Sequence, residues 1–140
     1  MEQRRTVLLA DTSTEFRILL REAMEKTGEF WVDVAQTGDE VLEKVQEQEP
    51  DILIMDEPTA PLTDNEVEIL FKLVRNLKKR GVSIIYISHR LEELFEISDR
   101  ITVMRDGQYV ATLDTPAAEI SEVIRLMVGR TIYEEPKTKS

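Results

Sequence analysis

Short apolar runs alternate along the chain with longer segments in which apolar residues recur every three or four positions. The short runs are typical of buried strands, and the longer segments are typical of amphipathic helices. Their alternation predicts strand–helix–strand units and therefore a parallel sheet. The expected strands are Val7–Ala10, Phe30–Ala35, Ile52–Met55, Val82–Ser88 and Ile101–Met104.

The ends of the expected helices carry local signals. Thr12, Thr37 and Thr63 each stand three residues before a glutamate, which is the spacing of a capping box. Gly81 stands where the glycine that follows a helix belongs, and Thr115-Pro116 is a cap followed by a first-turn proline. Apolar faces at helical spacing cover residues 16–24, 41–45, 67–77, 91–95 and 120–127.

A turn signal near the end of the chain completes the expected fold. Asp106-Gly107 is a strong hairpin signal, so Tyr109–Leu113 is expected to return antiparallel to the fifth strand. We expect an α/β fold of three αβα layers, with five parallel strands in the flavodoxin-like order 2-1-3-4-5 and an antiparallel sixth strand. A P-loop-like order, with the first strand between the fourth and the fifth, is the alternative. Residues 1–133 are expected to form one domain, followed by a polar tail over 134–140.

Charge and composition narrow the classes of function. The chain has 140 residues and a formal net charge of -10, which argues against binding to nucleic acid or to anionic lipid. It contains no cysteine, so disulfides and thiolate metal sites are excluded. No apolar run approaches the roughly 18–20 residues that cross a bilayer, and no signal peptide is visible. We therefore expect no nucleic-acid partner, no membrane attachment by the chain itself, and a monomer or homodimer.

Polar residues follow the expected strands at their carboxyl ends. Ligands bind at this edge in open parallel sheets, and carboxylates there suit Mg²⁺. A weak magnesium site at Asp11 and Asp56 is one interpretation, and simple solvation of the strand ends is the other. The strand-end residues are Asp11, Asp56 with Glu57, Ser88 with His89, and Arg105.

Several stretches within residues 4–56 carry a first resemblance, among them Val7–Asp11, Gln36–Glu40 and Pro50–Asp56. Residues 4–56 resemble the first half of a bacterial response-regulator receiver. The resemblance implies that Asp56 is a phosphoacceptor and that Asp11 is a Mg²⁺ ligand. Thr12 stands where the family has a second acidic residue, and Arg105 lies near the place of an expected lysine. The resemblance therefore implies an incomplete phosphorylation site.

Five stretches within residues 51–132 carry a second resemblance: Ile52–Thr59, Ala60–Thr63, Ile84–Arg90, Asp99–Gly107 and Met127–Arg130. They resemble the C-terminal part of an ABC-transporter ATPase of the sugar-importer type, in which the first three are the Walker B motif with its glutamate, the D-loop and the H-loop. The resemblance implies that Asp56 holds Mg²⁺ through water, that Glu57 polarises the attacking water and that His89 contacts the γ-phosphate.

The sequence lacks the segment that would cradle a triphosphate. No G-x-x-x-x-G-K-[ST] run occurs in the 140 residues, and the ABC signature motif is also missing. We therefore expect that the chain is not an enzyme, that Asp56, Glu57 and His89 are relics, and that no cofactor binds beyond weak Mg²⁺. The expected function is that of an engineered chimera serving as a stable scaffold. A Mg²⁺-binding or phosphoacceptor site at Asp56, in a signalling or interaction module, is the alternative. Both parent families imply a cytoplasmic location.

Overall fold

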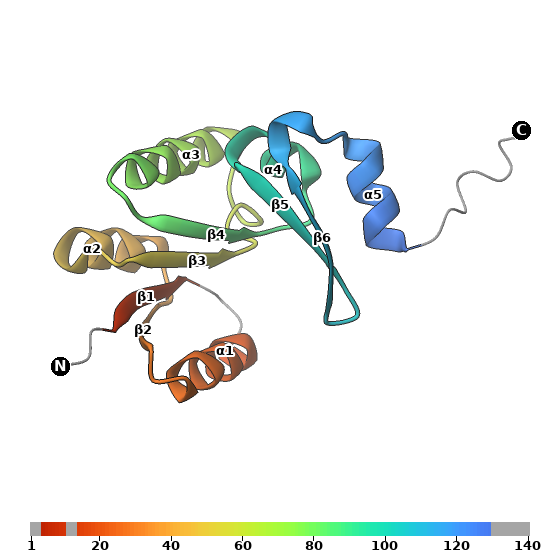
Figure 1. Cartoon of the computed structure of the whole chain (residues 1–140). Helices are drawn as coiled ribbons and strands as arrows, with labels where there is room; N and C mark the ends of the chain where they lie inside the picture. Colours follow the sequence, from red (N-terminus) through yellow and green to blue (C-terminus); the bar gives the residue numbers. More distant parts are fainter. Residues whose placement is uncertain (1–3, 11–13, 130–140) are drawn as a thin grey trace, which may run out of the picture. The chain divides into compact units, whose positions relative to one another are not determined.

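A parallel sheet forms the centre of residues 1–89 in the computed structural model, which describes residues 4–10 and 14–129 (Figure 1). Within these residues the sheet has the order β2-β1-β3-β4, so β1 pairs with both β2 and β3. The strands are β1 (Arg5–Ala10), β2 (Phe30–Ala35), β3 (Ile52–Asp56) and β4 (Ser83–Ile87). The helices of this part are α1 (Thr14–Lys26), α2 (Gly38–Gln48) and α3 (Asp64–Lys79).

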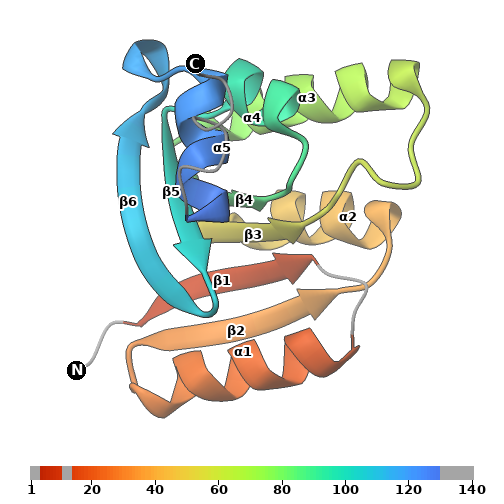
Figure 2. The same cartoon turned by 90° about the vertical axis from the view of Figure 1, so that its right-hand side faces the viewer.

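Helices cover both faces of this sheet (Figure 2). On one face, three apolar residues of α1 pack against a buried cluster from β1, β2 and β3. These are Phe16, Leu20 and Met24 of α1, packed against Val7, Leu9, Val32 and Ile54. On the other face, Leu8 and Leu53 are buried side by side in register, beneath α2 and α3. The three-layer α/β class expected from the sequence is confirmed.

The order of the first four strands is also confirmed, and the P-loop-like alternative is wrong because β1 pairs with β2 and β3. The fifth strand differs from the expectation. Within the described residues β5 (Arg100–Arg105) pairs with β6 (Gln108–Asp114) in a separate antiparallel sheet. Along β5 Ile101 and Val103 are buried, whereas Thr102 and Met104 are exposed. This alternation belongs to a sheet with one solvated face, not to a parallel sheet buried on both.

The described residues fall into two compact units, the first within Met1–His89 and the second within Arg90–Ser140. The hairpin signal is confirmed, because Asp106 and Gly107 take φ angles of +53° and +75° at the tip between β5 and β6. Thr115-Pro116 lies in a short 3₁₀ turn (Thr115–Ala117), so the last helix begins later than expected. The helices of the second unit are α4 (Leu91–Ile97) and α5 (Ile120–Val128).

Of the three threonines predicted from capping-box spacing, two are confirmed as helix caps. The Thr37 hydroxyl accepts a hydrogen bond from the Glu40 amide at 3.1 Å. Thr63 and Glu66 form a complete capping box at the start of α3. The third predicted cap, Thr12, lies outside the described residues.

The extent of the domain stays a prediction. The described residues fall into two units, and the expected tail over 134–140 lies outside the part of the chain that the structure describes. Across residues 4–10 and 14–129, no helix combines the length and the apolar character that crossing a membrane requires.

Candidate functional site

The carboxyl end of β3 carries the most distinctive backbone geometry of the first unit. Glu57 follows Asp56 directly and has a φ of +49°, in the left-handed region that non-glycine residues rarely adopt. Its amide donates a hydrogen bond of 2.7 Å to the carbonyl of Ile87, at the end of the neighbouring strand β4. The backbone therefore stays tied to β4 while the chain turns away from the sheet at Glu57.

This turn brings Glu57 and His89 together. Asp56 and Ile87 are register partners, so the chain leaves β3 and β4 at the same level. Glu57 Oε2 lies 2.7 Å from His89 Nδ1 and accepts a second hydrogen bond, 3.2 Å long, from the His89 amide. The structure thus unites two of the residues singled out in the sequence.

The pair is open to solvent, which matters for its chemistry. The His89 side chain is 77% exposed and that of Glu57 is 31% exposed. Both contacts use Oε2 of Glu57, so Oε1 can accept a hydrogen bond from a water molecule. A carboxylate that is fixed in place and can reach water has the geometry of a general base.

The expected magnesium pair is only half described. Asp56 ends β3 beside Glu57, at the edge where ligands bind in such sheets. Asp11 lies outside the described residues, so the pairing of Asp11 with Asp56 stays a prediction. Among the residues that the structure describes, no group of three or more histidine, cysteine, aspartate or glutamate side chains could hold a metal ion.

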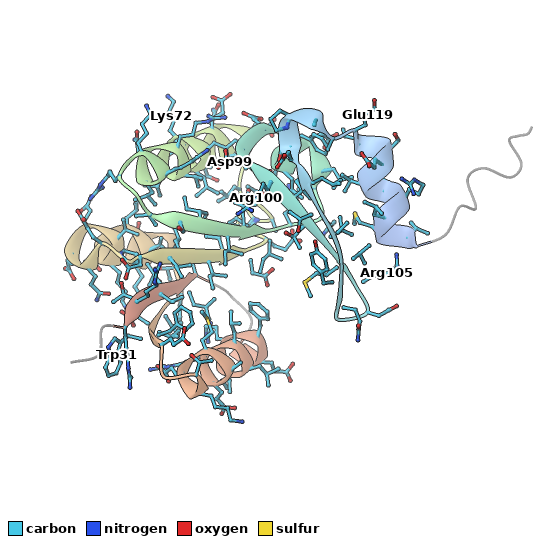
Figure 3. The ribbon with its side chains drawn as sticks, in the orientation of Figure 1. Trp31, Lys72, Asp99, Arg100, Arg105 and Glu119 are labelled. Atoms are coloured by element: carbon cyan, nitrogen blue, oxygen red, sulfur yellow. The ribbon has the colours of Figure 1, made fainter. Side chains whose placement is uncertain are left out.

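Arg105 lies in the second unit, where its side chain binds the end of α5 (Figure 3). Its Nη1 atom donates a hydrogen bond of 2.7 Å to the carbonyl of Leu126, in the last turn of α5. A cation there satisfies a carbonyl left without an intrahelical partner and complements the helix dipole. The sequence suggested a strand-end role because β5 was expected in the parallel sheet, whereas β5 belongs to the hairpin.

The sequence identified Glu57 and His89 as candidate site residues, but it did not predict the positive φ of Glu57 that brings their side chains together. The only local signal was the proline after Glu57, which marks a turn without fixing its type. It also missed a groove between α2 and α3, because such a space depends on how far apart two helices lie.

Curated proteins related to this chain are ATP-binding components of sugar importers. The ribose import ATP-binding protein RbsA of Bacillus licheniformis is 59% identical over 83 residues, which are 59% of this chain and 17% of that protein. RbsA 2 of Burkholderia ambifaria is 56% identical over 81 residues, 58% of this chain and 16% of that protein. A putative ribose/galactose/methyl galactoside import ATP-binding protein of Agrobacterium fabrum is 43% identical over 104 residues, 74% of this chain and 21% of that protein.

These relatives support the ABC-ATPase resemblance of the second half. The matches in the two RbsA proteins have about the length of region 51–132, and the chain spans only about a sixth to a fifth of the relatives it matches. No protein-family model matches the chain. The receiver resemblance of residues 4–56 gains no support from these relatives and stays a prediction.

Two expectations from the sequence are contradicted by this homology. The interpretation as an engineered scaffold without catalytic function is wrong, because the chain is 59% identical over 83 residues to a ribose import ATP-binding protein. The expectation that the chain is not an enzyme is wrong for the same reason, since its relatives are ATP-binding components of importers. The error came from treating a missing phosphate loop as decisive, although a loop of this kind can lie on another stretch of polypeptide.

Proposed function

We propose that this chain supplies the hydrolytic side of an ATP site in a protein that drives sugar import, acting in the cytoplasm. One observation carries the proposal, the 2.7 Å contact between Glu57 Oε2 and His89 Nδ1 at the carboxyl edge of the sheet. The identity of 59% to a ribose import ATP-binding protein supports ribose or a related sugar as the transported solute.

Each residue has a distinct task in this proposal. Glu57 accepts a proton from the attacking water, and His89 holds the carboxylate in position and reaches the γ-phosphate. Asp56 is the residue that would hold Mg²⁺, an ion that sites of this class bind through one or two carboxylates together with the substrate phosphates.

The phosphate cradle comes from a segment outside these 140 residues. The sequence holds no phosphate-loop motif, and the relatives are about five to six times as long as the parts they match. The outer edge of β4 is a suitable place for that segment, because no strand pairs there among the described residues. An open edge offers a row of backbone donors and acceptors to an added strand. In the ABC-ATPase resemblance, the strand that feeds the phosphate loop lies on this side of the fourth strand.

We further infer that residues 4–56 are a receiver-like frame for the hydrolytic residues. The order β2-β1-β3-β4 supports this inference, because it is the order that the receiver resemblance implies. In this frame β1 pairs along one side of β3 and β4 along the other, which fixes the place where Asp56 and Glu57 leave the sheet.

The proposal is tested by restoring the missing part. The full chain is mixed with a fragment of the Bacillus licheniformis relative that carries the phosphate-loop sequence, and phosphate release from Mg-ATP is measured. We expect release by the mixture above the sum of the separate polypeptides. Glu57→Gln should lower the rate about 100-fold, because it removes the base and keeps the shape of the side chain.

A matched variant separates the chemistry from effects on folding. Glu68→Gln changes the same side chain at an exposed position of α3 and should leave the rate unchanged. A mixture no faster than its separate parts, or equal losses in Glu57→Gln and Glu68→Gln, would overturn the proposal.

A further inference from the structure

A large groove lies between α2 and α3 on the sheet face opposite α1. Its volume is about 900 Å³, and its floor includes Ala10, Ala35 and Met55 near the ends of β1, β2 and β3. Leu42 of α2 and Ile69 of α3 are part of the lining, with 43% and 67% of their surface exposed. Two aliphatic side chains so exposed beside one hollow leave apolar surface that a bound molecule would cover.

The charges around this groove all have one sign. Among the described residues that line it, the charged ones are Asp39, Asp56, Glu57 and Glu66, and none of these described residues is Lys, Arg or His. His89 contacts Glu57 from outside this lining. The N-termini of α2 and α3 lie nearby and contribute roughly half a positive charge each, which is too little to cancel four carboxylates. The Glu66 carboxylate also accepts a hydrogen bond from the Thr63 amide, in the capping box of α3. The groove therefore remains negative.

We propose that this groove binds a small organic cation with an apolar, preferably aromatic, body. A volume of about 900 Å³ is at the upper end of the range for pockets that enclose drug-sized molecules. The apolar floor and walls contact the body of the ligand, and the carboxylates neutralise its charge. The same carboxylates disfavour anions of equal size, because like charges repel each other at this short range.

This groove adjoins the proposed ATPase site and shares Asp56 and Glu57 with it, but the two ligands differ in charge. ATP is an anion and needs the edge where Glu57 and His89 meet, whereas the body of the cation lies between the helices on Leu42 and Ile69. The binding of the cation requires no phosphate loop, so it can be measured on the 140-residue chain alone.

The charge preference is tested with two fluorescent probes of similar size. Auramine O is an apolar aromatic cation, and 1-anilinonaphthalene-8-sulfonate is an apolar aromatic anion. We expect saturable 1:1 binding of the cation, with the anion weaker by about ten-fold or more. Equal binding of the two probes, tighter binding of the anion, or no saturable binding of the cation would overturn the proposal.

The location is tested with a matched pair of charge insertions. Ile69→Lys adds a positive charge to the groove, and Leu19→Lys adds the same charge to α1, where the replaced side chain is 66% exposed against 67% for Ile69. We expect cation affinity to fall about ten-fold in Ile69→Lys and to stay within about two-fold in Leu19→Lys. Leu42→Lys provides a second test from the opposite wall, and far-UV circular dichroism verifies that each variant is folded. Equal affinities in the three variants would place the cation elsewhere.

Discussion

Glu57 adopts an unfavourable backbone conformation at the position where its side chain meets His89. A non-glycine residue in the left-handed region costs on the order of 1 kcal/mol, and the chain keeps it where the side chain meets His89. The sequence could identify both residues because each belongs to a recognisable motif. It could not give the φ angle of Glu57, since that angle results from the hydrogen bond to Ile87 across the sheet.

The positive φ of Glu57 predicts that glycine is favoured over alanine at this position, the opposite of the order within a helix. Glu57→Gly should be more stable than Glu57→Ala by about 1 kcal/mol, because glycine adopts a positive φ without a steric penalty. At the helical position Glu68 the order should reverse, with glycine less stable than alanine by about 1 kcal/mol. Urea unfolding of the four variants measures both differences. The same order at the two positions would argue against strain at Glu57.

Asp33 makes part of the stability dependent on pH. Burial alone would raise the pKa of Asp33, but hydrogen bonds from Lys44 and from the Val34 amide, with the charge of Lys44, lower the pKa below its ordinary value of 3.8. A lowered carboxyl pKa stabilises the fold above the unfolded-state pKa, and that contribution is lost as the pH falls through the folded-state value. The Asp33 side chain is 42% exposed, so the contribution is small.

Asp33→Asn should therefore lower the free energy of unfolding at pH 7 by less than about 1 kcal/mol. The difference from the unmodified chain should shrink as the pH is lowered from 7 through 3.8 and below. Urea unfolding at a series of pH values measures this difference. A constant difference down to the lowest pH at which both chains fold would contradict the assignment.

At the scale of elements, the burial of each strand determined how well its place in the fold could be predicted. Ile52–Met55 is apolar throughout, and β3 is the buried central strand that this pattern predicts. The run Ile101–Met104 contains Thr102, and β5 alternates between exposed and buried residues, unlike a doubly covered strand. The fifth strand was placed wrongly because a strand that follows a helix was assumed to extend the parallel sheet.

The end of α5 depends on close contact between Arg105 and Gly129. Gly129 has a φ of +86°, and a Cβ atom added there would lie 2.5 Å from the Arg105 guanidinium carbon. An alanine would therefore displace Arg105 from the Leu126 carbonyl as well as strain the backbone. Gly28 has a similar φ of +78° with nothing within 4 Å of the added atom, so it serves as a control for backbone strain alone.

We expect Gly28→Ala to cost about 1 kcal/mol and Gly129→Ala about 1 kcal/mol more, the second amount being the lost hydrogen bond. Denaturant unfolding followed by circular dichroism gives both values. In an Arg105→Ala background the excess at Gly129 should disappear, since the contact no longer exists. An excess that persists without Arg105 would assign it to the backbone.

At the scale of the whole molecule, the α/β class followed from the sequence and the function did not. The alternation of strands and helices is a property of the chain itself, so it could be recognised directly. The proposed function depends on a phosphate loop that these 140 residues do not contain, and the absence of this loop was taken as evidence against catalysis. The relatives correct that inference, because they place the same type of segment in much longer ATP-binding proteins.

The net charge of -10 predicts a salt dependence that the whole chain shares. Repulsion among excess carboxylates destabilises the folded state, and salt screens it. The free energy of unfolding should rise by roughly 1 kcal/mol between 10 mM and 500 mM sodium chloride, where the Debye length falls from about 30 Å to a few Å. Urea unfolding at the two salt concentrations measures the change. A fall in stability would mean that attractive ion pairs outweigh the repulsion.

In the proposed function, Glu57 acts on water beside the γ-phosphate of ATP. The most direct measurement of this role is the ratio of phosphate-release rates between the unmodified chain and Glu57→Gln, each combined with the same phosphate-loop fragment. We expect a ratio of about 100 or more. A ratio near one, in mixtures that do hydrolyse ATP, would show that the catalytic base lies elsewhere.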